Sequence, residues 1–452
     1  MIAIHPFKAW RPAPEQVEQI ACVPYDVIDT EEARVLAEGR PDSFLHVIRP
    51  EIDLPADTDL YSDIVYETGA VNLKKMCQSG ILIQDPEPRL YLYQQQMGDH
   101  IQTGLFTCVS VRDYDENRIL KHELTRPDKE DDRTRHILTQ QAHAEPVMLT
   151  YVPSDRVSAL TRQILETEEP VYDFEATDGV KHRVWVIGDP APFVDAFREI
   201  PKLYVADGHH RCKSASRAAG ALRNGDYGND EFEFFPAVVI PMDQMQILAY
   251  NRVIKAVPDD FLTRLKSRFD VRERVEPVPS RKGSICLYYQ DVWYGLDLPD
   301  EQGDQAVALE PDPGSTSKPG SHARDGGQVG DSGTAPDGDR GIDGATAHDD
   351  SRGTGEDVAG RLDVSRLHRH ILRPLLGIEN QRTDPNLVFV GGIRGTRELK
   401  QRVDQGRAQL GISMYPTSIA ELMAVSDNDQ LMPPKSTWFE PKLRSGLLIH
   451  TF

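Results

Sequence analysis

An apolar run in this chain leads directly into a polar turn and a helix, and this junction limits the possible folds more than any other part of the sequence. Residues 203–206 are apolar, residues 207–211 read D-G-H-H-R, and residues 211–222 have the composition of a helix. The apolar run predicts a short buried strand, and Gly208 permits the sharp turn that must follow it. Because free backbone N–H groups at a helix start attract anions, this junction is a candidate phosphate-binding position.

Two interpretations of this turn compete. In the structural interpretation, Asp207 caps the helix and the two histidines pack as neighbours in the core. In the functional interpretation, Arg211 offers a charged fork suited to phosphate, and Asp207 and the histidines supply acid–base groups. Four polar residues beside an apolar strand favour the functional interpretation. A catalytic zinc ion is disfavoured, because adjacent histidine side chains diverge and the chain contains no H-E-x-x-H motif.

One segment differs sharply in composition from the rest of the chain. The 452 residues are 39% hydrophobic and 27% charged, as expected for a soluble protein of two or three domains. Residues 303–358, in contrast, are mostly Gly, Asp, Ser, Thr and Pro. Such a composition buries too little surface to offset its ordering entropy, so we expect a disordered acidic insertion. Residues 300–357 contain 14 acidic and 4 basic residues, so this stretch carries 10 of the 21 net negative charges.

The same composition limits the partners and the location of the protein. The acidity of the chain argues against a nucleic-acid partner, because binding nucleic acid requires a broad basic face on the protein. The chain has no window of eighteen apolar residues and no signal-peptide pattern at its N-terminus, and its five cysteines are widely spaced without a C-x-x-C pair. We therefore expect a cytoplasmic protein with reduced thiols and no membrane span.

The hydrophobic patterns predict an α+β (mixed α/β) fold in which hairpin-containing mixed sheets pack against helices. Strands are predicted at 43–48, 89–96, 102–111, 146–152, 183–187, 203–206, 236–240, 246–250, 284–289 and 386–390. Helices are predicted at 31–37, 60–80, 129–141, 154–166, 192–198, 211–222, 259–268, 362–376 and 397–404. Thr30 and Thr396 are the predicted caps of the first and the last of these helices. The expected organisation is a main α+β domain at 1–302, the insertion at 303–358, and a C-terminal α/β segment at 359–452 that packs on the main domain.

Residues 121–136 form a second polar cluster, with the sequence K-H-E-L-T-R-P-D-K-E-D-D-R-T-R-H. Thr125 with Asp128 resembles a capping box, after which a charged helix is predicted. Salt bridges on a solvated helix explain residues 130–135, but they explain residues 121–126 less well, because these precede the cap. Glu123 is therefore a candidate general base or Mg²⁺ ligand, and the structural interpretation is equally supported.

Three further segments carry weaker signals. The glycine-containing loop after residues 386–390 matches neither the dinucleotide-binding fingerprint nor the P-loop, so a plain turn is favoured there. The P-P-K-S-T sequence at 433–437 lacks the glycines of a P-loop, although Lys435 can still contact a phosphate. Lys8, Tyr25 and Asp26 are candidate pocket residues near the N-terminus, and each taken alone is an ordinary loop residue.

Several strings, taken together and in order, resemble a known protein family. They are H-P-F-K-A from residue 5, P-Y-D-V-I from 24, F-L-H-V from 44, K-H-E-L-T-R-P-D-K-E-D-D-R from 121, A-D-G-H-H-R from 206 and M-P-P-K-S-T-W-F-E-P-K-L from 432. The set resembles the domain of unknown function family 1015 along the whole chain except the 303–358 insertion. The A-D-G-H-H-R string is also similar to the phosphate-binding strand–turn–helix of the ParB/sulfiredoxin superfamily, which includes free L-serine kinases with a D-G-H-[HT]-R turn.

This resemblance implies a nucleotide-dependent small-molecule kinase that uses Mg²⁺ with ATP or ADP and phosphorylates free L-serine or another hydroxylated metabolite. Sulfinic acid reduction is disfavoured, because His209 replaces the cysteine of the sulfiredoxin turn. The implied roles are catalytic for Glu123, Asp207 and His209, nucleotide-binding for Gly208, His210, Arg211 and Lys435, and substrate-binding for Lys8, Tyr25, Asp26 and Arg126. The alternative is a nucleotide-binding regulator without turnover or a ParB-like partition module.

Overall fold

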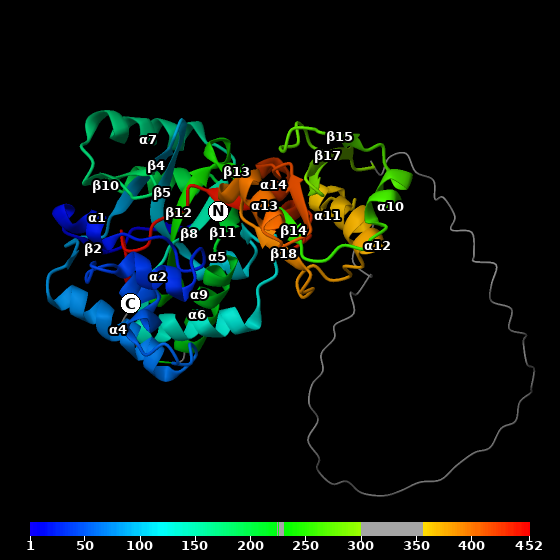
Figure 1. Ribbon diagram of the computed structural model, residues 1–452. Coiled ribbons are helices and arrows are strands. Elements are labelled where there is room, and N and C mark those ends of the chain that lie inside the picture. The colour runs from blue at the N-terminus through cyan, green and yellow to red at the C-terminus, as the bar shows by residue number, and fades with distance from the viewer. Residues whose placement is uncertain (224, 226–229, 300–355) are drawn as a thin grey trace, which may run out of the picture. The chain divides into compact units, whose positions relative to one another are not determined.

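The computed structural model describes residues 1–223, 225, 230–299 and 356–452. Residues 1–299 and 358–452 form one compact unit, so the C-terminal stretch belongs to the same body as the first 299 residues (Figure 1). The insertion expected at 303–358 lies outside the described residues, apart from its last three positions. Of the helices in the described part of the chain, none has both the length and the apolar composition needed to cross a membrane.

A large mixed sheet holds the strands of the first half of the chain. Its spatial order is β6 (Ile119–Leu120), β11 (Leu203–Asp207), β8 (Val147–Tyr151), β12 (Phe234–Pro241), β5 (His100–Ser110), β4 (Leu90–Met97), β10 (Lys181–Ile187) and β9 (Tyr172–Glu175), and β1 (Ile4–His5) also pairs with β5. The pairs β6–β11 and β8–β12 are parallel, whereas the other neighbours run antiparallel. Together with its helices, this mixed sheet confirms the α+β fold class.

A second, antiparallel sheet combines strands from before and after the insertion. Its order is β15 (Arg272–Glu273), β17 (Val292–Asp297), β16 (Ser284–Tyr289), β19 (Leu410–Met414), β14 (Asn251–Ile254) and β18 (Leu387–Val390). Short two-stranded pairings add β2 (Trp10–Pro12) to β3 (Leu82–Gln84), β7 (Ala142–His143) to β21 (His450–Thr451), and β13 (Gln246–Leu248) to β20 (Trp438–Glu440). The last of these pairings directs the C-terminal segment back toward the large sheet.

Helices cover these sheets (Figure 1). They are α1 (Val17–Ile20), α2 (Thr30–Ala37), α3 (Leu45–Ile48), α4 (Asp63–Gln78), α5 (Val111–Asp115), α6 (Pro127–Gln140), α7 (Asp155–Thr167), α8 (Ala191–Phe197), α9 (His209–Leu222), α10 (Phe261–Arg268), α11 (Asp363–Leu367), α12 (Arg373–Leu376), α13 (Gly395–Asp404) and α14 (Ile419–Asp427). Helix α9 packs against α6, where Arg217 and Glu130 form an ion pair at 3.2 Å. A π-helical turn at His368–Leu372 joins α11 to α12.

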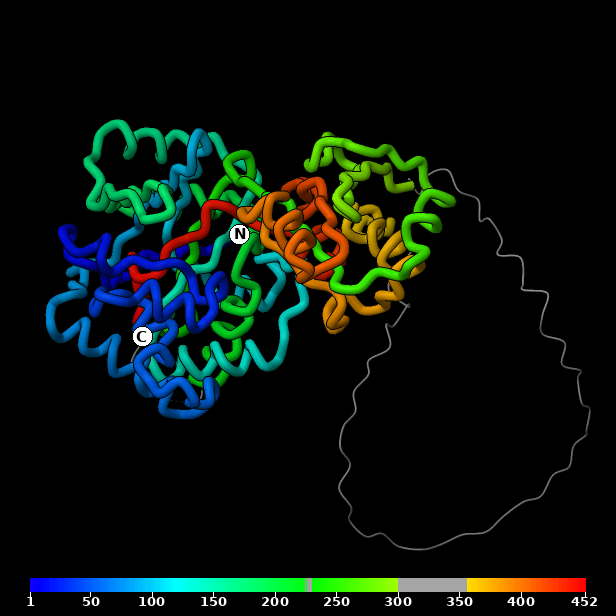
Figure 2. Tube along the Cα trace, viewed as in Figure 1, coloured from blue at the N-terminus to red at the C-terminus, as the bar shows by residue number. Residues whose placement is uncertain are grey.

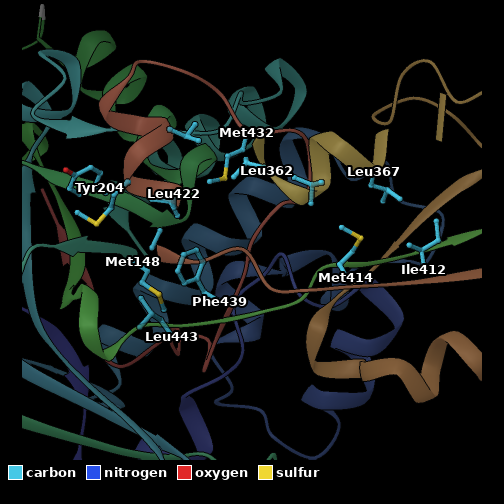
Figure 3. Close-up of a cluster of buried hydrophobic side chains, with 14 of the residues drawn as sticks. Met148, Tyr204, Leu362, Leu367, Ile412, Met414, Leu422, Met432, Phe439 and Leu443 are labelled. Atoms are coloured by element: carbon cyan, nitrogen blue, oxygen red, sulfur yellow. The ribbon is translucent and has the colours of Figure 1, made fainter. Parts of the chain in front are cut away.

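One buried apolar cluster connects the large sheet with the C-terminal segment. It contains Met148 of β8 and Tyr204 of β11 together with Leu422 of α14, Phe439 of β20 and Leu443 (Figure 3). The hydroxyl of Tyr204 also donates a hydrogen bond to Asp427 at 2.9 Å. Burial of such side chains stabilises a fold by roughly 1.5–3 kcal/mol each. The cluster therefore holds residues 432–443 next to the strand that ends in the D-G-H-H-R turn.

The N-terminal and C-terminal segments lie side by side (Figure 2). Trp10 forms a bridge with Ile449, and Cys22 exchanges both backbone hydrogen bonds with Ser445. The chain just after Cys22 is thereby placed beside the C-terminal segment.

The expected elements agree with the structure except in a few local details. Residues 43–48 were expected as a strand, but α3 begins there at Leu45. Phe44, Leu45, Val47 and Ile48 are all buried. A short segment with so few exposed positions carries no clear period, so the β-branched Val47 and Ile48 misdirect its prediction. Helix α2 is capped by Asp29 rather than by Thr30.

The capping box expected from Thr125 and Asp128 is also wrong. Helix α6 has Arg126 at its N-cap without a side-chain cap, and the Thr125 hydroxyl instead donates to Glu130. Pro127 occupies the first helical position as expected. Thr396, expected to cap the helix at 397–404, lies inside α13, which begins at Gly395.

Candidate functional site

The D-G-H-H-R turn joins β11 to α9 through a backbone shape that favours glycine. Gly208 has a φ of +96° and stands at the N-cap of α9. A Cβ at this position would lie 3.0 Å from Nε of Arg211 and 3.2 Å from Cγ1 of Val147. The pairing of β11 with β8 also shifts register between Val205 and Asp207. Such irregularities near the end of a strand re-aim the side chains that follow.

Strand pairing brings a second loop to the turn. Strands β6 and β11 are parallel neighbours, so their carboxyl ends meet at the same edge of the sheet. The segment 121–126, which follows β6, therefore lies beside the 207–211 turn, which follows β11. Strand β8 runs antiparallel to β11, and for this reason its start at Pro146 and Val147 reaches the same edge. Ligands of open α/β sheets characteristically bind at such carboxyl ends.

Asp207 is held by two cations. Arg211 donates to its Oδ2 at 3.1 Å, and Nζ of Lys442 lies 3.4 Å from its Oδ1. Burial disfavours the charged carboxylate, but Lys442 and Arg211 outweigh this effect and lower the pKa of Asp207 to about 2. Asp207 is therefore ionised throughout the physiological range.

The buried side chain of Arg211 links the turn to neighbouring segments. Its guanidinium donates to the backbone carbonyl of Pro146 and lies 3.7 Å from Oδ2 of Asp26. Burial opposes the charge on Arg211, but Asp26 and Asp207 outweigh it and raise the pKa of the guanidinium. The side chain is only 9% exposed. A fully charged, buried arginine thus provides a permanent positive potential under the helix start.

The two histidines are neutral at pH 7. Burial lowers the pKa of His209 to about 3, and it also lowers the pKa of His210. Nδ1 of His209 lies 3.7 Å from Oε2 of Glu123. Since His209 is uncharged, this contact is a dipolar contact and not an ion pair. Glu123 keeps 34% of its side chain exposed, which leaves the carboxylate accessible from solvent.

The C-terminal segment adds lysines and aromatic rings. The backbone N–H of Met432 donates to the carbonyl of His122 at 2.8 Å, which places the following residues beside Glu123. Desolvation opposes the charge on Lys435, but Tyr250 and Glu123 outweigh it and raise the pKa of the ammonium. Lys435 has a φ of +57°, an unusual conformation for a residue with a side chain. Strained backbone of this kind concentrates at functional sites.

The structure brings most of the predicted site residues together. Contacts join Glu123 and Asp26 to the turn formed by Asp207, Gly208, His209, His210 and Arg211. Burial is the main cause of the lowered pKa of His210, and Lys435 lies near enough for its charge to lower that pKa further. For the side chains of three predicted residues, no hydrogen bond or ion pair to the turn is found among the described residues. Tyr25 is buried beneath the guanidinium of Arg133 at 4.1 Å from the ring centroid, and Arg126 pairs with Asp128 at 2.7 Å. Lys8 is exposed, and among the described residues no contact joins it to the turn.

Sequence reasoning missed two charged residues of this site. Lys442 pairs with Asp207, and its ammonium also lies 4.9 Å from the centroid of the Trp438 ring. Glu145 accepts hydrogen bonds from the N–H of Tyr25 at 3.1 Å and from the hydroxyl of Ser445 at 3.0 Å. Lys442 lies within the M-P-P-K-S-T-W-F-E-P-K-L string. That string contributes to the family resemblance, but it does not indicate that Lys442 pairs with Asp207. No local pattern distinguishes Glu145.

The arrangement suits a phosphorylated ligand together with a proton acceptor. Helix α9 has fourteen residues, and its first turn presents free N–H groups beside Arg211 and two lysines. In the described part of the chain, no group of three or more His, Cys, Asp or Glu side chains is arranged to hold a metal ion. Mg²⁺ commonly binds to one or two carboxylates together with substrate phosphates, and the partly exposed carboxylate of Asp26 fits that mode.

Comparisons with other proteins place the chain in a family. No curated protein matches it. Among solved structures it is similar to a free serine kinase in complex with AMP, at 10% identity and a TM-score of 0.34, over 74% of this chain and 86% of that one. It is also similar to a conserved hypothetical protein from Pyrococcus furiosus, at 11% identity and a TM-score of 0.33, over 74% of this chain and 90% of that one. A third similar structure is SbnI with a C-terminal truncation from Staphylococcus aureus, at 11% identity and a TM-score of 0.34, over 76% of this chain and 86% of that one.

A family model described as a protein of unknown function (DUF1015) matches residues 4–317, which is well over half of the sequence. This match confirms the family resemblance and covers five of the six strings, whereas the string that begins at residue 432 lies beyond the matched residues. The chain belongs to the DUF1015 family.

Proposed function

We propose that this protein is a nucleotide-dependent phosphotransferase that moves a phosphoryl group to the hydroxyl of a small molecule. One observation carries the proposal: the carboxylate of Glu123 lies at the start of α9, in contact with His209, where the helix and its cations favour phosphate. A proton acceptor and a phosphate-binding helix start, side by side at a sheet edge, are the two parts that phosphoryl transfer requires.

The nucleotide phosphates would bind to the first turn of α9. Its backbone N–H groups point away from the helix, and Gly208 allows a phosphate to approach them closely. Arg211 supplies charge from beneath the turn, while Lys435 and Lys442 supply it from the C-terminal segment. Asp207 orients Arg211 and Lys442, because one carboxylate oxygen faces each cation.

Glu123 would act as the general base. As the acceptor hydroxyl attacks the terminal phosphorus, its proton passes to the Glu123 carboxylate. A new P–O bond forms to the acceptor oxygen, and the bond between the phosphorus and the nucleotide's bridging oxygen breaks. The nucleotide then leaves with one phosphate fewer and carries away the electron pair. Neutral His209 contributes a dipole that orients Glu123 and does not compete for the proton.

Mg²⁺ would enter with the nucleotide and neutralise charge on the transferred phosphoryl group. Asp26 is the carboxylate of this site that best fits such a role, since it is partly exposed and lies 3.7 Å from Arg211. Free L-serine is the first acceptor to test, because the D-G-H-H-R turn resembles that of free serine kinases. Other small hydroxylated metabolites belong to the same substrate class.

The proposal is tested by incubating the full chain with Mg²⁺, ATP or ADP and a panel of hydroxylated metabolites that includes L-serine. Phosphorylated product is measured by mass spectrometry, and nucleotide affinity by calorimetry. We expect Glu123→Gln to bind nucleotide within about threefold of the parent while its transfer rate falls by about 10²–10⁴-fold. Lys435→Met should weaken nucleotide binding by about tenfold, the effect of one charged contact.

Glu169→Gln is a matched control, because Glu169 is an exposed glutamate in the loop after α7. It should leave both binding and transfer unchanged. Nucleotide binding without transfer to any acceptor would instead support a nucleotide-binding regulator without turnover. Absence of nucleotide binding would overturn the phosphate assignment of α9 altogether.

A further inference from the structure

Both histidines of the turn accept hydrogen bonds from the backbone of the loop that carries Glu123. The N–H of Arg126 donates to Nε2 of His210 at 3.1 Å. The N–H of His122 points to Nε2 of His209 at 3.5 Å, a longer and weaker contact. Glu123 lies between these two N–H groups in the sequence, so the imidazoles hold the loop on both sides of the carboxylate.

The loop depends on such contacts, because its own backbone forms no helix or strand. Residues 121–126 are irregular between β6 and α6. The N–H of His122 is buried, and a buried N–H without a partner costs free energy comparable to a lost hydrogen bond. The N–H of Arg126 lies in an exposed part of the loop, where its hydrogen bond to His210 replaces one to water and ties the backbone to α9. An imidazole nitrogen accepts only when the ring is neutral, and burial keeps both rings neutral at pH 7.

The hydrogen-bond pattern also assigns the tautomers. Since Nε2 accepts in each ring, the single proton of each neutral imidazole lies on Nδ1. For His209 this proton faces the Glu123 carboxylate at 3.7 Å. The rings of His209 and His122 further pack edge to face, with centroids 4.4 Å apart. The first turn of α9 thus contacts three parts of the loop: its backbone N–H groups, the ring of His122 and the carboxylate of Glu123.

We propose that His209 and His210 are positioning residues: a pair of neutral hydrogen-bond acceptors that fixes the 122–126 loop, and with it Glu123, against the first turn of α9. In this role neither histidine gains or loses a proton. His210 accepts its hydrogen bond from the backbone N–H of Arg126, whereas the side chain of Arg126 pairs with Asp128. We call this pair of acceptors, together with the loop that it fixes, the clamp. An effect of the clamp on the transfer rate rests on the proposed function of Glu123, whereas the clamp itself does not.

Amide hydrogen exchange followed by mass spectrometry tests the clamp directly. His210→Phe keeps a ring of similar size but removes the acceptor, whereas His210→Gln places an amide oxygen at a similar reach. We expect peptides spanning 121–127 to exchange at least about tenfold faster in the Phe variant, and near-parental exchange in the Gln variant. Peptides from α10 serve as the internal control, because they report whether the whole protein has been destabilised.

Enzyme kinetics provide the second readout. With the clamp broken, kcat should fall at least about tenfold in His210→Phe while KM for the nucleotide stays within about threefold, and His210→Gln should recover most of the rate. A proton-transferring histidine would not be rescued by glutamine. Equal loop exchange in the Phe variant and the parent, with α10 unchanged, overturns the clamp, and so does failure of glutamine to restore loop protection. Altered exchange in a protein without transferase activity leaves the clamp standing and refutes the proposed function.

Discussion

Replacing Gly208 with alanine should destabilise the protein and displace Arg211 at the same time. The φ of +96° at this residue is one that alanine adopts only at a cost of about 1–2 kcal/mol. The new Cβ would also lie 3.0 Å from Nε of Arg211 and 3.2 Å from Val147. Arg211 cannot yield freely, because Pro146 and Asp207 hold its guanidinium. Weakening those hydrogen bonds costs roughly another 1–2 kcal/mol, for a total of about 2–4 kcal/mol.

The assay is urea unfolding of Gly208→Ala and the parent, followed by far-UV circular dichroism. The midpoint should fall by an amount that corresponds to about 2–4 kcal/mol once the slope is held equal between the two proteins. Nucleotide affinity, measured in the absence of urea, should fall as well, because the guanidinium beneath the helix start has moved.

The matched control is Gly220→Ala in the same helix. A Cβ at Gly220 meets nothing within 4 Å, and its backbone conformation is an ordinary helical one. Alanine should therefore stabilise the protein by about 0.5–1 kcal/mol there. If Gly208→Ala unfolded at the same urea concentration as the parent or as Gly220→Ala, the turn geometry described above would be wrong.

Three further predictions concern the neighbours of the turn. Ionised Asp207 should stabilise the protein by roughly 2 kcal/mol above about pH 4, because its pKa is about 2 instead of the ordinary value near 3.9. This contribution should be lost as the pH falls toward 2. In acid titrations, Asp207→Asn should therefore lose less stability across that range than the parent. Lys442→Met removes a cation from Asp207 and should move the acid transition to higher pH, whereas an unchanged transition would contradict the pairing. Gly391→Ala would put a Cβ 2.5 Å from the rigid ring of Trp438 and should cost about 1–3 kcal/mol in urea unfolding, while Gly188→Ala, where a Cβ meets nothing within 4 Å, should cost less.

Much of the secondary structure can be predicted from the sequence, because its signals are local. The 203–222 junction is the clearest case: an apolar run, a glycine and a helical composition follow each other without interruption, and the structure has β11, Gly208 and α9 in that order. The hairpin of β4 and β5 can be predicted in the same way, because a short polar stretch at 97–100 separates two β-rich segments. The 43–48 segment is the opposite case, because it is short and mostly buried and so carries no clear period from which a helix or a strand could be predicted.

Local patterns also nominated Glu123 and the D-G-H-H-R turn as separate candidates, but they could not bring them together. Their contact depends on the parallel pairing of β6 with β11, and a two-residue strand such as β6 carries almost no periodic signal. The pairing of Asp207 with Lys442 depends in turn on the apolar cluster that holds the C-terminal segment against the large sheet.

The strand, the sharp turn and the helix start can all be identified from the sequence alone, because each depends on composition and backbone conformation within a few neighbouring positions. The meeting of Glu123, His209 and Lys442 at one sheet edge follows from the fold, as does the burial that keeps both histidines neutral. Burial and strand pairing set these properties, and both depend on residues distant in the chain.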